Sequence, residues 1–238
     1  METVGRYVDT SQRGTHERPS PQLGVNTQDS LFCFFSVSRL FVISAVFVHV
    51  ASSEPEPSVN SIISRTYQLL QSMKENTTIL LNTYRSHQGS PFTDPDFKGF
   101  NYSMHYKKVP LPSSNFPEWS NLSDIKRLEK NYQAYHNYLG LMKLVWEDQS
   151  ELNPDKGELL KMLKLTQKRI QGLLSNLTAI ISALGGPSAP VKDPPVPDLV
   201  GNDNFEKKEL GYVVCFWYRV WVERTLRDFN FLRRKYPS

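Results

Sequence analysis

The side chains best suited to chemistry downstream of residue 53 are three histidines and one cysteine: His87, His105, His136 and Cys215. No two of these histidines stand at a metal-ligand spacing, and no group of carboxylates accompanies them. The sequence contains no nucleophile elbow, phosphate-cradling glycine loop or dinucleotide fingerprint. Cys215 lies in an apolar stretch, where cysteine more often packs as a small apolar residue than reacts as a thiol. We therefore predict a protein that is not an enzyme and that uses no cofactor or metal ion.

The charge balance argues against nucleic acid as a partner. Lysine and arginine exceed aspartate and glutamate only enough to give a formal net charge of +4. Proteins that bind nucleic acid usually carry a stronger and more clustered excess of positive charge. We expect no nucleic-acid partner.

Four sequons of the form Asn-X-Ser/Thr follow residue 75, and none has proline at its middle position. Such tripeptides accept N-linked glycans in proteins that pass through the secretory pathway. Glycosylation is predicted at Asn76, Asn101, Asn121 and Asn176. The alternative is that some of them are ordinary asparagines on a helix surface, and Asn76 stands closest to an apolar helix face.

An apolar run over residues 31–51 follows a polar leader and ends in small residues, as a secretory signal peptide does. We predict that residues 1–53 are leader and signal segment and that residues 54–238 are the mature domain. The alternative is an anchor that retains residues 31–50, where Arg39 would cost about 3 kcal/mol in a bilayer. Both interpretations place the domain outside the cytosol. After cleavage it would keep one cysteine, no disulfide and no membrane segment.

Apolar residues recur at steps of three and four in four long segments, the pattern of amphipathic helices. The expected helices span residues 59–86, 122–148, 154–184 and 203–236. Ser58 or Asn60 should cap the first, Ser120 or Asn121 the second, and Asp203 or Asn204 the fourth. The inward positions expected in the fourth helix are Leu210, Val214, Trp217, Val220, Trp221, Phe229 and Leu232.

The lengths of the connections favour one topology without proving it. Residues 87–120 and 187–202 are long, proline-rich and largely irregular, and the aromatic residues of the first should pack it onto the helices. Residues 149–154 are too few to run back along a helix of 28 residues, which is about 42 Å long. The middle two helices must therefore be antiparallel. The predicted fold is all-α, a long-chain four-helix bundle with up-up-down-down order and two long crossover loops.

Several local motifs occur in one order along residues 61–235. They are Thr66-Tyr67, Pro91-Phe92, Pro95-Asp96-Phe97, Asn131-Tyr132-Gln133-Ala134-Tyr135, Ile170-Gln171-Gly172-Leu173-Leu174, Ala183-Leu184-Gly185 and Asp228-Phe229-Asn230. In these motifs and their order, the chain resembles the long-chain helical cytokines of the interleukin-6 family. It is most similar to the branch of cardiotrophin-like cytokine factor, ciliary neurotrophic factor and cardiotrophin. The resemblance implies a secreted, extracellular cytokine that brings cell-surface receptors together to start signalling.

The resemblance also implies three kinds of receptor contact. A non-signalling alpha receptor would meet the first helix, the first crossover and the end of the fourth helix. A shared signal-transducing glycoprotein receptor would meet exposed faces of the first and third helices. A leukaemia-inhibitory-factor-type receptor would bind a Phe-x-x-Lys motif, which stands here as Phe205 and Lys208. We expect both of these side chains to be exposed. The alternative is that these two are a hydrophobic helix cap and a solvated lysine. We expect Trp119 to join that patch.

The end of the fourth helix is basic: Arg224, Arg227, Arg233, Arg234 and Lys235. Arg227 and Arg234 are the candidate alpha-receptor contacts. A solvated helix end and a heparin-binding segment are the alternatives.

We expect a monomer, and the resemblance implies a secretion partner. A second class of function is a membrane-anchored helical surface or adhesion protein that keeps residues 31–50.

Overall fold

Helices make up most of the described part of the chain. The computed structural model describes residues 58–100, 109–112, 116–187 and 203–237. These contain α1 (Val59–Ser86), α2 (Phe116–Ser120), α3 (Asp124–Leu152), α4 (Gly157–Ala183) and α5 (Asn204–Lys235), and no strand. Nothing in these ranges is a helix both apolar and long enough to span a bilayer. The predicted leader and signal segment, residues 1–53, and the sequon at Asn101 lie outside the described residues.

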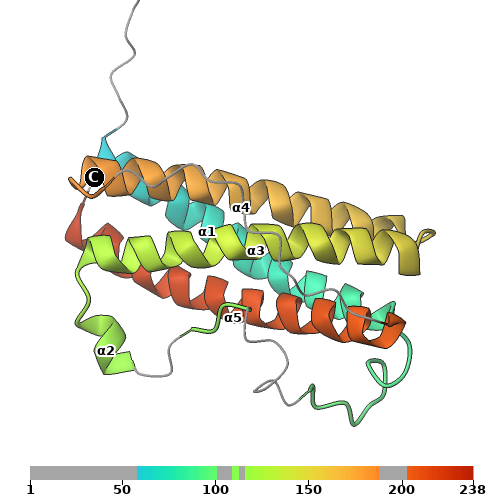
Figure 1. Cartoon of the computed structure of the whole chain (residues 1–238). Coiled ribbons are helices and arrows are strands. Elements are labelled where there is room, and N and C mark those ends of the chain that lie inside the picture. The colour runs from blue at the N-terminus through green and yellow to red at the C-terminus, as the bar shows by residue number, and fades with distance from the viewer. Residues whose placement is uncertain (1–57, 101–108, 113–115, 188–202, 238) are drawn as a thin grey trace, which may run out of the picture. The chain divides into compact units, whose positions relative to one another are not determined.

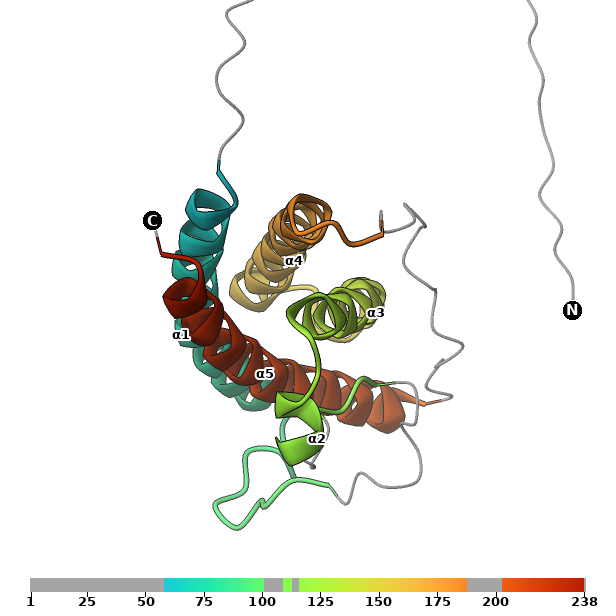
Figure 2. The same ribbon diagram turned by 90° about the vertical axis from the view of Figure 1, so that its left-hand side faces the viewer.

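The four long helices pack in a square. α1 lies against α4 and α5, and α3 lies against the same two, so α1 and α3 are diagonal. The end view in Figure 2 shows this arrangement, with the short helix α2 outside the square, next to α5. The Lys207 ammonium at the start of α5 pairs with Glu151 at the end of α3, and Lys235 at the end of α5 pairs with Asp124 at the start of α3.

These pairings make α5 antiparallel to α3. The contact between Lys164 and Trp146, with the hydrogen bond from Gln167 to the carbonyl of Met142, makes α4 antiparallel to α3 as well. In Figure 1, α1 and α3 run one way and α4 and α5 the other. The up-up-down-down prediction is confirmed.

The bounds of α1 agree with the prediction, and so does its cap, because the Ser58 hydroxyl accepts a hydrogen bond from the Ser61 amide. The Asp203 carboxylate caps α5 in the same way, at 2.8 Å from the Glu206 amide. α4 stops where expected: Gly185 adopts φ +76°, a conformation that glycine takes without a steric penalty.

Three boundary predictions are wrong. α3 continues to Leu152, four residues beyond its predicted end at 148, because the helical hydrogen bonds persist until the Asn153 amide bonds the Gln149 carbonyl. Ser123, rather than Ser120 or Asn121, caps α3, because residues 116–120 form the short helix α2 and the chain must turn before α3 begins. The start of α4 lies three residues later than predicted, since residues 153–156 form a turn in which the Lys156 amide bonds the Asn153 carbonyl.

Tyrosines contribute much of the volume of the core. Tyr84, Tyr135, Tyr138 and Tyr218 are fully buried between the helices. The predicted inward face of α5 is partly wrong, since Trp217 and Val220 are only half-buried. α5 contacts both α1 and α3, so its buried face is wider than the predicted stripe. It also includes Val213, Val222 and Thr225.

Candidate functional site

The start of α5 presents an exposed aromatic side chain. Phe205 lies in the first turn after the Asp203 cap, where side chains on the outer face of the helix meet solvent. It retains 45% of its accessible surface. The sequence prediction that this residue is exposed agrees with the structure.

The Phe205 ring contacts a group of other aromatic rings. Together they form what we call the aromatic cluster: Phe92, Phe97, Phe100, Phe205 and Tyr212. The ring centroid of Phe205 lies 6.1 Å from those of both Phe92 and Phe100. Most pairs in the cluster meet edge to face, the arrangement that aromatic quadrupoles favour. Residues 92–100 of the first connection therefore pack onto α5, as predicted, and their rings support the side chain of Phe205.

Arg85 at the end of α1 fastens this connection. Its guanidinium donates from Nε and Nη2 to the Phe92 carbonyl at 3.1 and 3.0 Å, and it lies 5.3 Å from the centroid of the Phe97 ring. Sequence reasoning recognised the Pro-Phe motifs but did not assign Arg85, Phe100 or Tyr212 to the site. Only the pairing of the first connection with α5 brings them there.

Lys208 differs from its expectation, because its side chain is half-buried rather than fully exposed. Its ammonium donates a 3.0 Å hydrogen bond to the carbonyl of Gln88. Two of its three N–H donors remain for other acceptors. The lysine therefore joins the end of α1 to the start of α5, one turn away from Phe205.

A buried polar network holds this end of the bundle in place. The Tyr84 hydroxyl donates to the Lys208 carbonyl at 3.0 Å and accepts from Gln149 Nε2 at 3.0 Å. Gln149 Oε1 in turn accepts from Gln88 Nε2 at 2.9 Å. Burial raises the pKa of Tyr84 well above its usual value, so the hydroxyl keeps its proton and remains a donor. The network ties α1, α3 and α5 together beneath the aromatic cluster.

An acidic rim flanks the site. Lys207 pairs with Glu151 at 2.8 Å and with Asp148 at 3.6 Å. Burial raises the pKa of Asp148, and the neighbouring Lys207 charge opposes that rise. An exposed aromatic side chain, a cation and a charged rim form a surface suited to protein recognition.

The geometry gives no support to catalysis. Among the described residues, no three His, Cys, Asp or Glu side chains converge as a metal site would require. Cys215 is buried, and burial raises the pKa of its thiol, which keeps it in the unreactive form.

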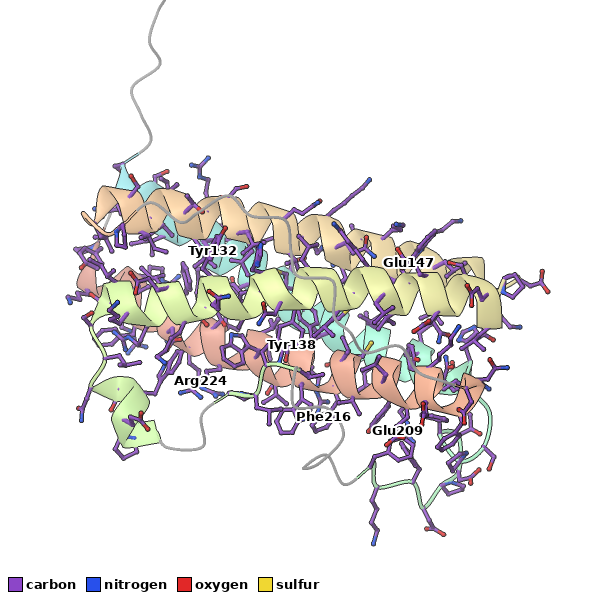
Figure 3. All side chains as sticks on the ribbon, in the orientation of Figure 1. Tyr132, Tyr138, Glu147, Glu209, Phe216 and Arg224 are labelled. Carbon is purple, nitrogen blue, oxygen red and sulfur yellow. The ribbon has the colours of Figure 1, made fainter. Side chains whose placement is uncertain are left out.

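Trp119 does not lie at this site, so the expectation that it joins the Phe205 patch is wrong. It is 5% exposed, and its indole N–H donates to Asp228 at 2.9 Å, near the other end of α5. Asp228 follows Phe205 by 23 positions, which is about 35 Å along a helix. In Figure 3, Arg224 marks this end of α5, while Glu209 marks the end that carries Phe205.

The environment of Trp119 is a second buried network. Asp228 also accepts from Asn131 at 3.2 Å, and the Asn131 amide oxygen accepts from Trp221 at 3.0 Å. Burial raises the pKa of Asp228 although Trp119 and Asn131 both donate to it. The Arg224 guanidinium lies 3.8 Å from the centre of the Trp119 ring. Trp119 thus fastens α2 to α5, and Asp228 links this contact to Asn131 on α3.

The two candidate alpha-receptor residues, Arg227 and Arg234, are exposed. Their basic neighbours are engaged: Lys235 pairs with Asp124, and Arg233 lies 4.3 Å from the centre of the Tyr67 ring. Burial acts to raise the pKa of Asp124, but hydrogen bonds from Lys235, Arg127 and Tyr236 outweigh it and lower the pKa.

Among the three described sequons, Asn121 is the most open, because it is exposed in the turn between α2 and α3. Asn176 is half-buried on α4. Asn76 is half-buried on α1, and its amide donates to the Ser72 carbonyl at 2.6 Å. Glycosylation at all four sequons stays a prediction.

Comparison with known proteins gives consistent matches over most of the chain. The family described as "Plethodontid receptivity factor PRF" matches residues 28–238. Cardiotrophin-2 of Mus musculus is 37% identical over 189 residues, which cover 79% of this chain and 88% of the relative. Cardiotrophin-1 of Rattus norvegicus is 28% identical over 178 residues, with coverages of 72% and 85%. Ciliary neurotrophic factor of Oryctolagus cuniculus is 25% identical over 175 residues, with coverages of 72% and 82%.

Proposed function

The chain belongs to the plethodontid receptivity factor family and is an interleukin-6 family cytokine, and from this premise we propose that it is secreted and assembles cell-surface receptors to start signalling. The fold supports the proposal because the core of the bundle leaves the outer faces of its helices free for other proteins. The observation that carries it is Phe205, which is 45% exposed yet fixed by its contacts with Phe92 and Phe100.

We infer that Phe205 and Lys208 bind a leukaemia-inhibitory-factor-type receptor. A rigid aromatic side chain loses little conformational freedom on binding, and aromatic anchors of this kind dominate the energetics of interfaces. The ammonium of Lys208 supplies donors beside it for a carbonyl or carboxylate of the partner. Arg85, Phe97 and Tyr212 would support the anchor rather than contact the receptor directly.

The test is the affinity of Phe205→Ala for the purified ectodomain of such a receptor, measured by surface plasmon resonance. We expect a loss of about thirtyfold, because hot-spot side chains contribute about 2 kcal/mol or more. Phe231→Ala is a matched control, since Phe231 lies on the same helix and is 50% exposed. The control should bind this receptor as the parent does. Unchanged affinity of Phe205→Ala would remove the basis for this contact.

The two other receptor contacts follow from exposed surfaces. Arg227 and Arg234 lie exposed on the end of α5, and we propose them as contacts of an alpha receptor. The outer faces of α1 and α4 are proposed for the shared signal-transducing receptor, and Ile79 on α1 is an exposed apolar side chain there, at 53%. A secretion partner remains part of the proposal, and the secreted form would be a monomer.

The alternative function is a membrane-anchored surface or adhesion protein that retains residues 31–50. N-terminal sequencing of the protein from expressing cells separates the two. A chain that begins near residue 54 in the culture medium supports the cytokine, and a chain that stays in the membrane fraction with residues 31–50 supports the anchor. Removal of N-glycans before mass spectrometry reports in the same samples which of the four sequons are occupied.

A further inference from the structure

A row of exposed lysines runs along the first half of α4. Lys161, Lys164 and Lys168 are all exposed, and their spacing of three and four residues places them on one face of the helix. The row is about 10 Å long at 1.5 Å per residue. None of the three forms an ion pair with a carboxylate of the described residues. We call these three residues the lysine row.

The lysine row borders a shallow apolar depression of about 400 Å³ between α3 and α4. Trp146, Leu160 and Leu165 form its apolar lining. Leu165 is 44% exposed, and the Lys164 ammonium lies 3.6 Å from the centre of the Trp146 ring. The neighbouring Glu147 on α3, labelled in Figure 3, lies toward the end of α3 away from α2.

At the basic end of α5, Arg227 and Arg234 are exposed, but their basic neighbours contact other side chains. Lys235 is paired with Asp124, Arg233 lies over Tyr67, and Arg224 is buried over Trp119. These interactions hold the cationic groups to the bundle. The lysine row differs from the end of α5 because its three cations lie in line beside one apolar depression.

We propose that the lysine row and the depression beside it bind a sulfated polysaccharide. Sulfate groups carry permanent negative charge, and a linear chain laid along α4 would place them against three ammonium groups in turn. Trp146 and Leu165 provide apolar surface for the C–H faces of the sugar rings. A bilayer would need a flat surface that spans several elements, whereas the row is one helix wide. The identity of the biological ligand depends on the extracellular location proposed above, because sulfated polysaccharides lie outside the cell. The binding measured with the purified chain does not depend on that location.

The experiment measures the affinity of the full mature chain for a size-defined heparin oligosaccharide in about 150 mM NaCl by isothermal titration calorimetry. The test variant is Lys161→Gln/Lys164→Gln/Lys168→Gln. Glutamine has nearly the helix propensity of lysine, so the fold should persist, and circular dichroism checks it. The matched control, Arg227→Gln/Arg233→Gln/Arg234→Gln, removes the same number of charges from the end of α5.

We expect the affinity for the oligosaccharide to fall tenfold or more in the α4 variant and less than about threefold in the control. Each ammonium group close to an anionic ligand contributes to the binding free energy at this salt concentration. A larger loss in the control would place the glycan on α5 and overturn the proposal. Equal binding of a desulfated oligosaccharide would also overturn it. So would stronger binding to phosphatidylserine vesicles than to the glycan, which would identify a membrane surface.

A second measurement locates the ligand. Four tryptophans give four indole N–H signals in a nitrogen-15 correlation spectrum, and only that of Trp146 should shift strongly on titration with the oligosaccharide. A dominant shift at Trp119 would contradict the proposal even if the affinity data agreed. Because neither measurement includes a receptor, failure here leaves the cytokine function untouched, and failure of the Phe205 experiment leaves this proposal untouched.

Discussion

Replacement of Gly211 by alanine should destabilise the bundle at the end that carries Phe205. Gly211 lies in the second turn of α5, directly against the Tyr84 side chain of α1. An added Cβ would overlap the Tyr84 hydroxyl and lie 2.5 Å from the ring carbon Cζ. Tyr84 is fully buried, so a shift of its ring would displace the side chains packed around it. The close packing of α1 on α5 therefore requires glycine here.

The magnitude follows from three contributions. Overpacking of a buried site costs about 1 to 3 kcal/mol. Displacement of the Tyr84 hydroxyl weakens its bonds to Lys208 and Gln149, each worth about 1 kcal/mol. The alanine gains back about 1 kcal/mol of helix propensity. We expect Gly211→Ala to lower the free energy of unfolding by about 2 to 4 kcal/mol.

A double-mutant cycle isolates the clash. Tyr84→Phe removes the overlapping oxygen together with its two hydrogen bonds, and should by itself cost about 1 to 3 kcal/mol. In the Tyr84→Phe background, Gly211→Ala should cost less than it does beside the tyrosine, by about 1.5 kcal/mol or more. The measurement is urea unfolding followed by circular dichroism, with linear extrapolation to water.

Gly172→Ala on α4 is the control, because an added Cβ there would contact nothing and the change should be neutral or stabilising. A neutral or stabilising Gly211→Ala, or a cycle with no coupling to Tyr84, would show that α1 and α5 do not pack as described. Gly211→Ala should also weaken binding to the leukaemia-inhibitory-factor-type receptor, since Tyr84 anchors the turn of α5 that presents Lys208.

Two further predictions concern the other end of the bundle and the face of α5. Asp124→Asn should cost about 1 to 2 kcal/mol at pH 7. Because the folded-state pKa of Asp124 is lowered, its stabilisation is present above about pH 4 and is lost as the pH falls through the lowered value. Wild type and variant should therefore converge in urea unfolding near about pH 2, and a constant difference would contradict the assigned hydrogen bonds. Trp221→Ala should cost about 3 to 5 kcal/mol and Trp217→Ala about 1 to 2, since only Trp221 is buried; the reverse order in thermal unfolding would mean that α5 is rotated.

The sequence was sufficient to predict four long helices and their order. Apolar residues at steps of three and four report a helix locally, and the reach of each connection limits how the next helix can run. For the same reason the cap residues Ser58 and Asp203 and the stop at Gly185 agree with the structure. The short helix α2 and the true cap Ser123 escaped prediction, because proline-rich segments carry weak local signals.

The candidate site was only partly within reach of the sequence. Phe205 and Lys208 were identified by their motif, but Lys208 is half-buried and Trp119 lies about 35 Å away. Tyr84 and Lys208 are 124 positions apart, and Trp119 and Asp228 are 109 apart. Contacts over such separations depend on the rotation of each helix about its axis, which a periodic pattern defines only to within a broad stripe.

The amino-acid order by itself thus predicted the four long helices and the antiparallel direction of the middle two. The hydrophobic period is a local quantity, and a short connection cannot run back along a helix. Tertiary packing alone decided which aromatic rings support Phe205, which cations of α5 are engaged by partners, and which lysines of α4 stay open to solvent. Those outcomes depend on the distances between side chains of different helices, and no single segment encodes them.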